Sequence, residues 1–309
     1  SDGRPLLAGP APSSLRREIS QDLFADEWGI VWERRPDTLY FEVKEAPLKR
    51  ATVDDLAEYP WPELADPGRF AGLAEEARAL REQTNCAVVA LSGVSPFEFI
   101  QLLRGSEQFL TDLAADRDFA NALLRKITDL MLASVTQLVT AAGDFIDVIV
   151  MGDDMGTQSS LIMSPRMYRT MIKPLHAELI AAVKKRSKAK IFWHTDGNVY
   201  PLIGDFIEIG VDLLNPIQVS AGEMGNTERL KREFGKNLAF SGAIDTNWVL
   251  TNGSPEDVRR EVRRRIKDLA PGGGYVLSSV HCIQPDVPVE NVEAMFDEAH
   301  RAGQYPITG

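Results

Sequence analysis

The sequence of 309 residues predicts an α/β fold, a TIM-type (β/α)8 barrel that follows an irregular N-terminal arm. Three observations support this prediction. Short apolar runs alternate with segments of helical periodicity six times after residue 85, no change of composition marks a linker, and the length suits one barrel of about 250 residues. Strict alternation on this scale requires a parallel sheet covered by helices. We therefore expect residues 1–25 to form the arm and residues 26–309 to form one barrel domain.

Each expected strand is an apolar run that ends in small or polar residues. The unbroken run at 86–91 suits a strand buried on both faces, as in parallel sheets. The other strands are expected at 146–151, 190–194, 211–214, 238–241 and 275–277, and the helices at 68–83, 96–104, 106–115, 117–141, 164–186, 199–209, 226–234, 255–269 and 288–302. A barrel needs two more strands, and only residues 28–46, with two short strand patterns, can supply them. An open doubly wound sheet is the alternative, but no G-x-G-x-x-G motif follows any strand.

Composition excludes several classes of function. The chain has 34 Lys and Arg residues against 45 Asp and Glu, a net charge of −11, which argues against a nucleic-acid partner or an anionic membrane surface. No apolar run approaches the roughly 20 residues that cross a bilayer. Two cysteines cannot form a disulfide scaffold and favour a reducing, cytoplasmic location. The chain starts with Ser1 and shows no signal-peptide pattern, which leaves open whether the natural N-terminus is missing.

Polar residues gather where the expected strands end, which is where a barrel carries out its chemistry. Strand-to-helix loops also favour Asp, Asn, Ser and Gly simply as helix caps and turn formers. Histidine is neither a preferred cap nor a turn residue, so the four histidines are more informative. His194 and His281 follow expected strands, whereas His176 and His300 fall in helices and are interpreted as structural or solvated.

A metal site is one interpretation of these strand ends. His194 and Asp196 point to the same side of an extended segment, so they can share a metal or orient one another. His281 and Cys282 follow the last strand, which would close beside the first and bring them to the same mouth. Imidazole, thiolate and carboxylate together make a zinc-binding set. No G-x-S-x-G elbow, P-loop or H-E-x-x-H motif offers another chemistry.

Several short segments together resemble a known family. They are Asp26–Trp32 (DEWGIVW), Leu91–Phe97 (LSGVSPF), Gly152–Gly156 (GDDMG) with Ser164-Pro165, Trp193–Asn198 (WHTDGN), Ser241–Asp245 (SGAID) and Val280–Pro288 (VHCIQPDVP). In this order they resemble the uroporphyrinogen decarboxylase superfamily over about residues 26–302, which implies a TIM-type barrel. This superfamily also contains cobalamin-dependent methyltransferases, and the first and last segments resemble its demethylase-type members most.

Individual residues distinguish the branches of this superfamily. The decarboxylases hold their substrate with an Arg-rich segment near the start, and this sequence has none. In the coenzyme M branch, zinc is held by His-x-Cys and a later Cys. Here His194 matches the first ligand, Asp196 stands where the Cys would be, and His281 falls at or beside the later one.

The resemblance implies a methyltransferase that moves a methyl group between a methylated ether, amine or thiol and a corrinoid cofactor, with zinc assistance. The corrinoid would be carried by a partner protein, and the arm allows a homodimer. A uroporphyrinogen decarboxylase-type lyase and a non-catalytic binding barrel remain the alternatives. The expected metal ligands are His194, His281 and Cys282; the expected catalytic residues are Asp196, Asp153 and Asp245; and the expected substrate contacts are Trp28, Ser95, Phe97, Asp154, Asn215 and Gln218.

Overall fold

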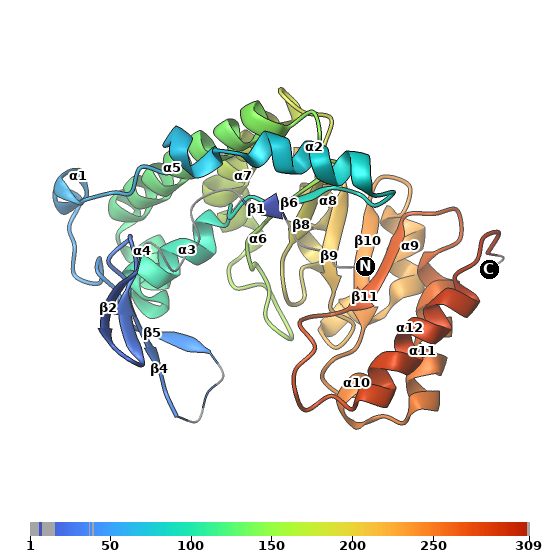
Figure 1. The fold of residues 1–309 in the computed structure, drawn as a ribbon. Coiled ribbons are helices and arrows are strands. Elements are labelled where there is room, and N and C mark those ends of the chain that lie inside the picture. The colour runs from blue at the N-terminus through green and yellow to red at the C-terminus, as the bar shows by residue number, and fades with distance from the viewer. Residues whose placement is uncertain (1–5, 8–15, 37, 39, 308–309) are drawn as a thin grey trace. The chain divides into compact units, whose positions relative to one another are not determined.

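The computed structural model describes residues 6–7, 16–36, 38 and 40–307, and the chain divides into two compact units. The first unit comprises residues 1–153 and 174–189, and the second comprises residues 154–173 and 190–309. Figure 1 labels most of the helices and strands, and its colour runs from blue at the N-terminus to red at the C-terminus. Each unit contains parallel strands followed by helices and is described by itself.

The first unit contains three parallel strands in the order β1 (Leu6–Leu7), β6 (Val89–Leu91) and β7 (Val148–Gly152). Its helices are α1 (Asp55–Glu58), α2 (Leu73–Gln83), α3 (Pro96–Arg104), α4 (Ser106–Ala115), α5 (Arg117–Ala142) and nearly all of α7 (Lys173–Lys184), with a 3-10 turn at Pro67–Phe70. The 26-residue helix α5 buries a continuous apolar face, and this face ends next to the turn that leads into β7.

A separate antiparallel sheet corrects one prediction. Its strands are β2 (Arg17–Ser20), β3 (Leu23–Ala25), β4 (Val31–Arg34) and β5 (Phe41–Glu45), paired in this order. Residues 28–46 therefore do not supply barrel strands, because connections this short join antiparallel neighbours, whereas parallel strands need a long crossover. Residues 1–25, expected to be irregular, contain three strands, of which β1 pairs with β6.

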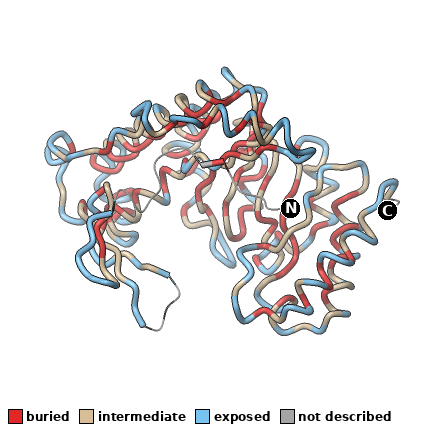
Figure 2. Tube along the Cα trace, in the orientation of Figure 1, coloured by how far each residue is buried: buried red, intermediate tan, exposed pale blue. Residues whose placement is uncertain are grey.

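The second unit contains four parallel strands in the order β8 (Lys190–His194), β9 (Leu213–Ile217), β10 (Ala239–Ile244) and β11 (Tyr275–Ser279). Its helices are α6 (Pro165–Met167), α8 (Ile203–Ile209), α9 (Thr227–Phe234), α10 (Val249–Asn252), α11 (Pro255–Leu269) and α12 (Val289–Ala302), with a π-turn at Tyr168–Ile172 and 3-10 turns at Tyr200–Leu202 and Gly222–Gly225. Strand β10 is the most continuously buried of these strands, whereas β11 has no fully buried residue (Figure 2).

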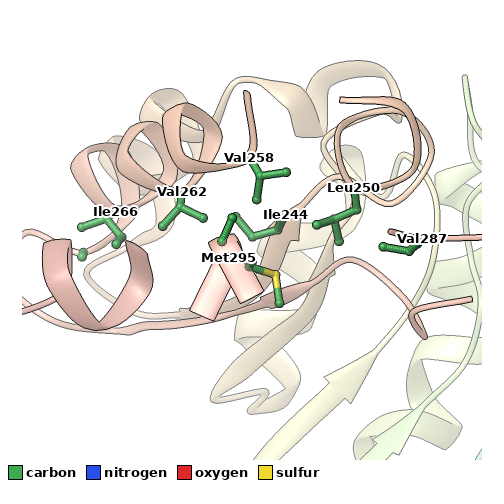
Figure 3. Packing of buried hydrophobic residues seen from close by; sticks show 9 residues of the cluster. Ile244, Leu250, Val258, Val262, Ile266, Val287 and Met295 are labelled. Carbon is green, nitrogen blue, oxygen red and sulfur yellow. The ribbon is translucent and has the colours of Figure 1, made fainter. Parts of the chain in front are cut away.

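A compact apolar cluster holds the C-terminal helices of this unit. Figure 3 shows Val258, Val262 and Ile266, spaced four residues apart on α11, pointing toward Met295 of α12 and the other labelled side chains. Helix α11 starts at a capping box formed by Ser254 and Asp257, which explains its sharp beginning. The same cluster includes Ile244 at the end of β10, Leu250, and Val287 in the segment after β11. This packing thus anchors the loop after β10, which carries Asp245, and the segment after β11, which carries His281 and Cys282.

The prediction of a TIM-type α/β fold is confirmed, with six parallel strands after residue 85 that are each followed by helix. The strand at 190–194 and the helices at 96–104, 106–115 and 255–269 match the expected ranges. The helix expected at 164–186 is interrupted by the π-turn between α6 and α7. Among the described helices, none has the length and apolar character needed to traverse a lipid bilayer.

Candidate metal centre

Three side chains of the second unit form a compact group, here called the triad: His194, Asp196 and His281. His194 is the last residue of β8, Asp196 lies two residues later, and His281 lies two residues after β11. The Nε2 atoms of His194 and His281 are 4.0 and 3.8 Å from Asp196 Oδ2. One ligand atom from each residue lies within 4.8 Å of the others, and the described residues contain no second group of this kind. Strand-end placement and side-chain alternation therefore bring together residues 85 positions apart.

Hydrogen bonds from the neighbouring strands fix the orientation of His194. The Oδ1 atom of Asn215, inside β9, accepts a hydrogen bond from His194 Nδ1 at 2.8 Å, and Asn215 Nδ2 donates to Ser241 Oγ in β10 at 3.2 Å. An amide oxygen can only accept, so Nδ1 carries the proton and neutral His194 keeps its lone pair on Nε2. This is the arrangement that metal-binding histidines usually show, with the second nitrogen held by an outer partner.

The loop that carries Asp196 is held on two sides. Asp154 Oδ1 accepts a hydrogen bond from the backbone N–H of Asp196 at 2.8 Å, and Gln218 Oε1 accepts from that of Gly197 at 2.6 Å. Gly156 packs directly against this loop, since a Cβ atom added there would lie 2.7 Å from the carbonyl oxygen of Asp196. Gly197 has φ +88°, a conformation that favours glycine. The position of the carboxylate is therefore set by the backbone on both sides of it.

The carboxylate of Asp196 is incompletely paired. Its Oδ1 atom is buried and has no hydrogen-bond partner among the described residues. Burial raises the pKa of Asp196, and the nearby charge of Asp154 raises this pKa further, while His194 and His281 oppose both effects. Leaving a buried polar atom unpaired costs about 1–3 kcal/mol. A bound cation would remove this cost and would favour the ionised carboxylate.

The donor set fits a divalent metal ion. Zinc binds imidazole nitrogen and carboxylate oxygen at about 2.0–2.2 Å, so tetrahedral ligand atoms lie about 3.3–3.5 Å apart. The observed separations of 3.8 and 4.0 Å from Asp196 Oδ2, and the separation of the two histidine ligand atoms, which lies within 4.8 Å, would shorten when a metal binds. Three protein ligands would leave a fourth position open, as catalytic zinc sites do.

Comparison with known proteins identifies the family. The family model described as "Uroporphyrinogen decarboxylase (URO-D)" matches residues 39–302. The chain belongs to the URO-D family. The resemblance seen in the sequence motifs is thereby confirmed.

Individual relatives of this URO-D family member are distant and are matched over part of their length. A "Uroporphyrinogen decarboxylase" of Coxiella burnetii is 26% identical over 203 residues, covering 63% of this chain and 51% of the relative. One from Thioalkalivibrio sulfidiphilus is 35% identical over 78 residues, covering 25% of this chain and 22% of the relative. The chain thus spans about half the length, or less, of these curated relatives.

A solved structure shares the fold of this URO-D family member. It is described as a "methyltransferase from Methanosarcina mazei", with a TM-score of 0.65 and 20% sequence identity. The match covers 90% of this chain and 77% of the other. At this identity, the likeness supports the shared fold.

Two more predicted residues of this URO-D family member, Cys282 and Asp245, lie in the second unit. Cys282 has an exposed thiol and lies outside the triad, so the structure brings two of the three expected ligands together and adds Asp196 in place of the thiol. Asp245 is 9% exposed and accepts hydrogen bonds from the backbone N–H groups of Asn247, Trp248 and Val249, which caps the start of α10. Its carboxylate is thereby engaged in shaping the loop after β10.

The remaining predicted residues lie in the first unit of this URO-D family member. Asp153 is 1% exposed and accepts hydrogen bonds from Ser95 Oγ and from the backbone N–H of Phe97, and its Oδ2 lies 2.8 Å from Nε2 of the buried His176. Phe97 is completely buried, and Trp28 packs against Phe99 at a ring distance of 4.4 Å. The structure therefore places Ser95, Phe97 and Asp153 in one buried network at the start of α3.

Sequence reasoning missed how the triad is supported. Asn215, Asp154 and Gln218 were expected to contact substrate, but their hydrogen bonds orient His194 or hold the loop of Asp196. The hydroxyl of Ser241 accepts a hydrogen bond from Asn215, but in the sequence Ser241 is only one of several polar residues at the ends of expected strands. None of these partners has a fixed sequence spacing from the residue that it supports, because it comes from another strand end than β8 and its loop.

Proposed function

We propose that this chain is a metal-assisted methyltransferase that moves a methyl group between a methylated small molecule and a corrinoid cofactor on a carrier protein. The observation that carries the proposal is the triad, with its unpartnered Asp196 Oδ1 and the free Nε2 of His194. The fold shared with the Methanosarcina mazei methyltransferase is consistent with it. The corrinoid cofactor and its carrier protein are part of the proposal because the sequence motifs resemble those of the methyltransferase branch.

The residues of the triad would hold the metal through His194 Nε2, His281 Nε2 and the Asp196 carboxylate. Bound zinc would act as a Lewis acid on the heteroatom that gives up its methyl group. Asn215 keeps the Nδ1 proton of His194 in place, so that Nε2 stays available as a donor. Asp154 and Gln218 hold the backbone of the Asp196 loop, so that its carboxylate stays close to the two imidazoles.

A metal-binding measurement with histidine variants tests the proposal. We expect about one zinc ion per chain in the purified protein and loss of this zinc in His194→Ala and His281→Ala. Both variants should also lose formation of methylcobalamin from cob(I)alamin and a methylated donor, followed by the change in visible absorption. His300→Ala is the matched control, since His300 is exposed on α12 and bonds only its own helix. Wild-type protein without bound metal, or His194→Ala with full methyl transfer, would refute the assigned role.

A carboxy-lyase activity is the second candidate, because the curated relatives are named uroporphyrinogen decarboxylases. It requires binding of a substrate with many carboxylates, which the net charge of −11 opposes. Conversion of uroporphyrinogen to coproporphyrinogen, at a rate unchanged in His194→Ala, would establish this activity in place of methyl transfer.

A further inference from the structure

The triad shares His281 with a pocket of about 400 Å³ in the second unit. The pocket lies between two segments, residues 246–251 after β10 and residues 281–287 after β11. Its volume falls at the lower end of the range of about 300–1,000 Å³ that is typical of small-molecule sites. A ligand in this pocket would contact His281, whose Nε2 atom lies 3.8 Å from Asp196 Oδ2.

The lining of this pocket is polar and carries negative charge only. Asp286 contributes a carboxylate, whereas no lysine or arginine lines the pocket. Asp286 is exposed and has no hydrogen-bond or ion-pair partner among the described residues. Thr246, Asn247 and Cys282 add hydroxyl, amide and thiol groups, which bind polar ligands without compensating this charge.

The surroundings of the triad add to this field. Asp154 lies beside the triad, since its Oδ1 atom accepts a hydrogen bond from the backbone N–H of Asp196 at 2.8 Å. Asp154, Asp196 and Asp286 together carry three negative charges, which outweigh the two positive charges of a zinc ion bound at the triad. Charges around a pocket act on a ligand before any contact forms, so the site should attract cations and repel carboxylates, even with metal bound.

We propose that this pocket binds a small organic cation, a methylated ammonium compound, with Asp286 as its counter-charge. This inference rests on the proposed function, since it makes the cation the methyl-bearing partner in that reaction. The nitrogen of a methylated ammonium ion has no lone pair, so a metal held by the triad would bind the neutral amine that leaves as the methyl group passes to the corrinoid. It selects the amine among methyl ethers, amines and thiols. It also explains in physical terms why a substrate with many carboxylates would be rejected here.

Binding of tetramethylammonium to the zinc-loaded protein, followed by calorimetry or NMR, tests the inference directly. Pivalate and tert-butanol serve as comparison ligands of similar size with negative and zero charge. We expect saturable tetramethylammonium binding that weakens as salt is added, weaker binding of tert-butanol, and none of pivalate. Asp286→Asn should weaken tetramethylammonium binding about three- to tenfold. Asp286→Lys should reverse the preference and favour pivalate.

Asp297→Asn provides the matched control, because Asp297 is an exposed aspartate on α12 outside the pocket lining. It should leave tetramethylammonium binding unchanged. Pivalate binding as tight as that of tetramethylammonium, or equal effects of the Asp286 and Asp297 variants, would overturn the inference. Zinc content is measured in the same samples: zinc without cation binding contradicts this inference alone, and cation binding without zinc contradicts the metal role alone.

Discussion

Each unit contains a histidine–aspartate pair, and the two pairs differ in how completely they are bonded. In the first unit, the side chains of His176 and Asp153 are fully buried and 2.8 Å apart. In the second unit, the side chains of His194 and Asp196 are 35% and 30% exposed and 4.0 Å apart. Asp153 has donors at both oxygens, whereas Asp196 Oδ1 has none among the described residues. The hydrogen-bonding groups of Asp153 are thus all engaged within the protein, whereas Asp196 retains an oxygen atom that can bind a ligand.

The largest expected difference lies in stability. Asp153→Ala should lower the free energy of unfolding by about 3–5 kcal/mol, because it removes the buried carboxylate that bonds Nε2 of His176 and the backbone N–H of Phe97 at the start of α3. Asp196→Ala in metal-free protein should cost less than about 1 kcal/mol, because it removes a partly exposed carboxylate whose Oδ1 atom is already unpaired. Urea denaturation of both variants measures these costs. Equal losses would contradict the distinction between a structural pair and a ligand-binding pair.

Much of the fold follows from local patterns in the sequence. The strand at Lys190–His194 has apolar residues between polar ends, and α11 begins with Ser254-Pro255, so both were predicted at their observed bounds. Strand β1 was missed, because two leucines carry no periodicity. Strand β9 continues past Leu214, where prediction ended it, because the polar Asn215 lies inside the strand and bonds His194. The hydrophobic pattern thus failed at Asn215, a polar residue that orients His194 in the candidate site.

The candidate site was predictable in part. Strand ends indicated His194, Asp196 and His281, since a parallel sheet brings such ends to one edge. The choice of Asp196 rather than Cys282 as the third member depends on side-chain direction after the strand, which sequence spacing does not determine. The same holds for Asp154 and Gln218, whose hydrogen bonds to the loop span 42 and 21 residues.

The second prediction concerns the partner of His194. Asn215→Ala should weaken zinc binding about 10- to 100-fold, because the imidazole loses the bond that fixes its orientation and its Nδ1 proton. Competition with a metal chelator measures the affinity. Asn237→Ala, at an exposed asparagine in the loop before β10, is the matched control and should bind zinc like the wild type. Unchanged zinc affinity in Asn215→Ala would mean that His194 binds no metal through Nε2.

The third prediction concerns pH and the Asp196 carboxylate. Its pKa in the folded protein is raised above the ordinary value of 3.8, mainly by burial, so ionising it on going to neutral pH costs stability. Asp196→Asn should therefore stabilise the metal-free protein by up to about 1 kcal/mol at pH 7. The gain should shrink as the pH falls through the raised pKa and vanish below 3.8, where both forms are uncharged. Thermal unfolding across this range in a chelator tests it, and a gain that persists at pH 3 would exclude an electrostatic origin.

The smallest expected effect is at Cys282, which is adjacent in sequence to a triad residue but lies outside the triad. Cys282→Ser should change zinc affinity less than about twofold, since metal affinity follows the ligands and their hydrogen-bonded partners. Cobalt(II) substituted for zinc distinguishes the ligand sets, because a thiolate ligand gives an intense ultraviolet charge-transfer band and nitrogen or oxygen ligands give none. The wild-type protein should lack this band. A band that is present in the wild type and lost in Cys282→Ser would make the thiol a ligand and would displace Asp196 from the metal, leaving its buried Oδ1 unexplained.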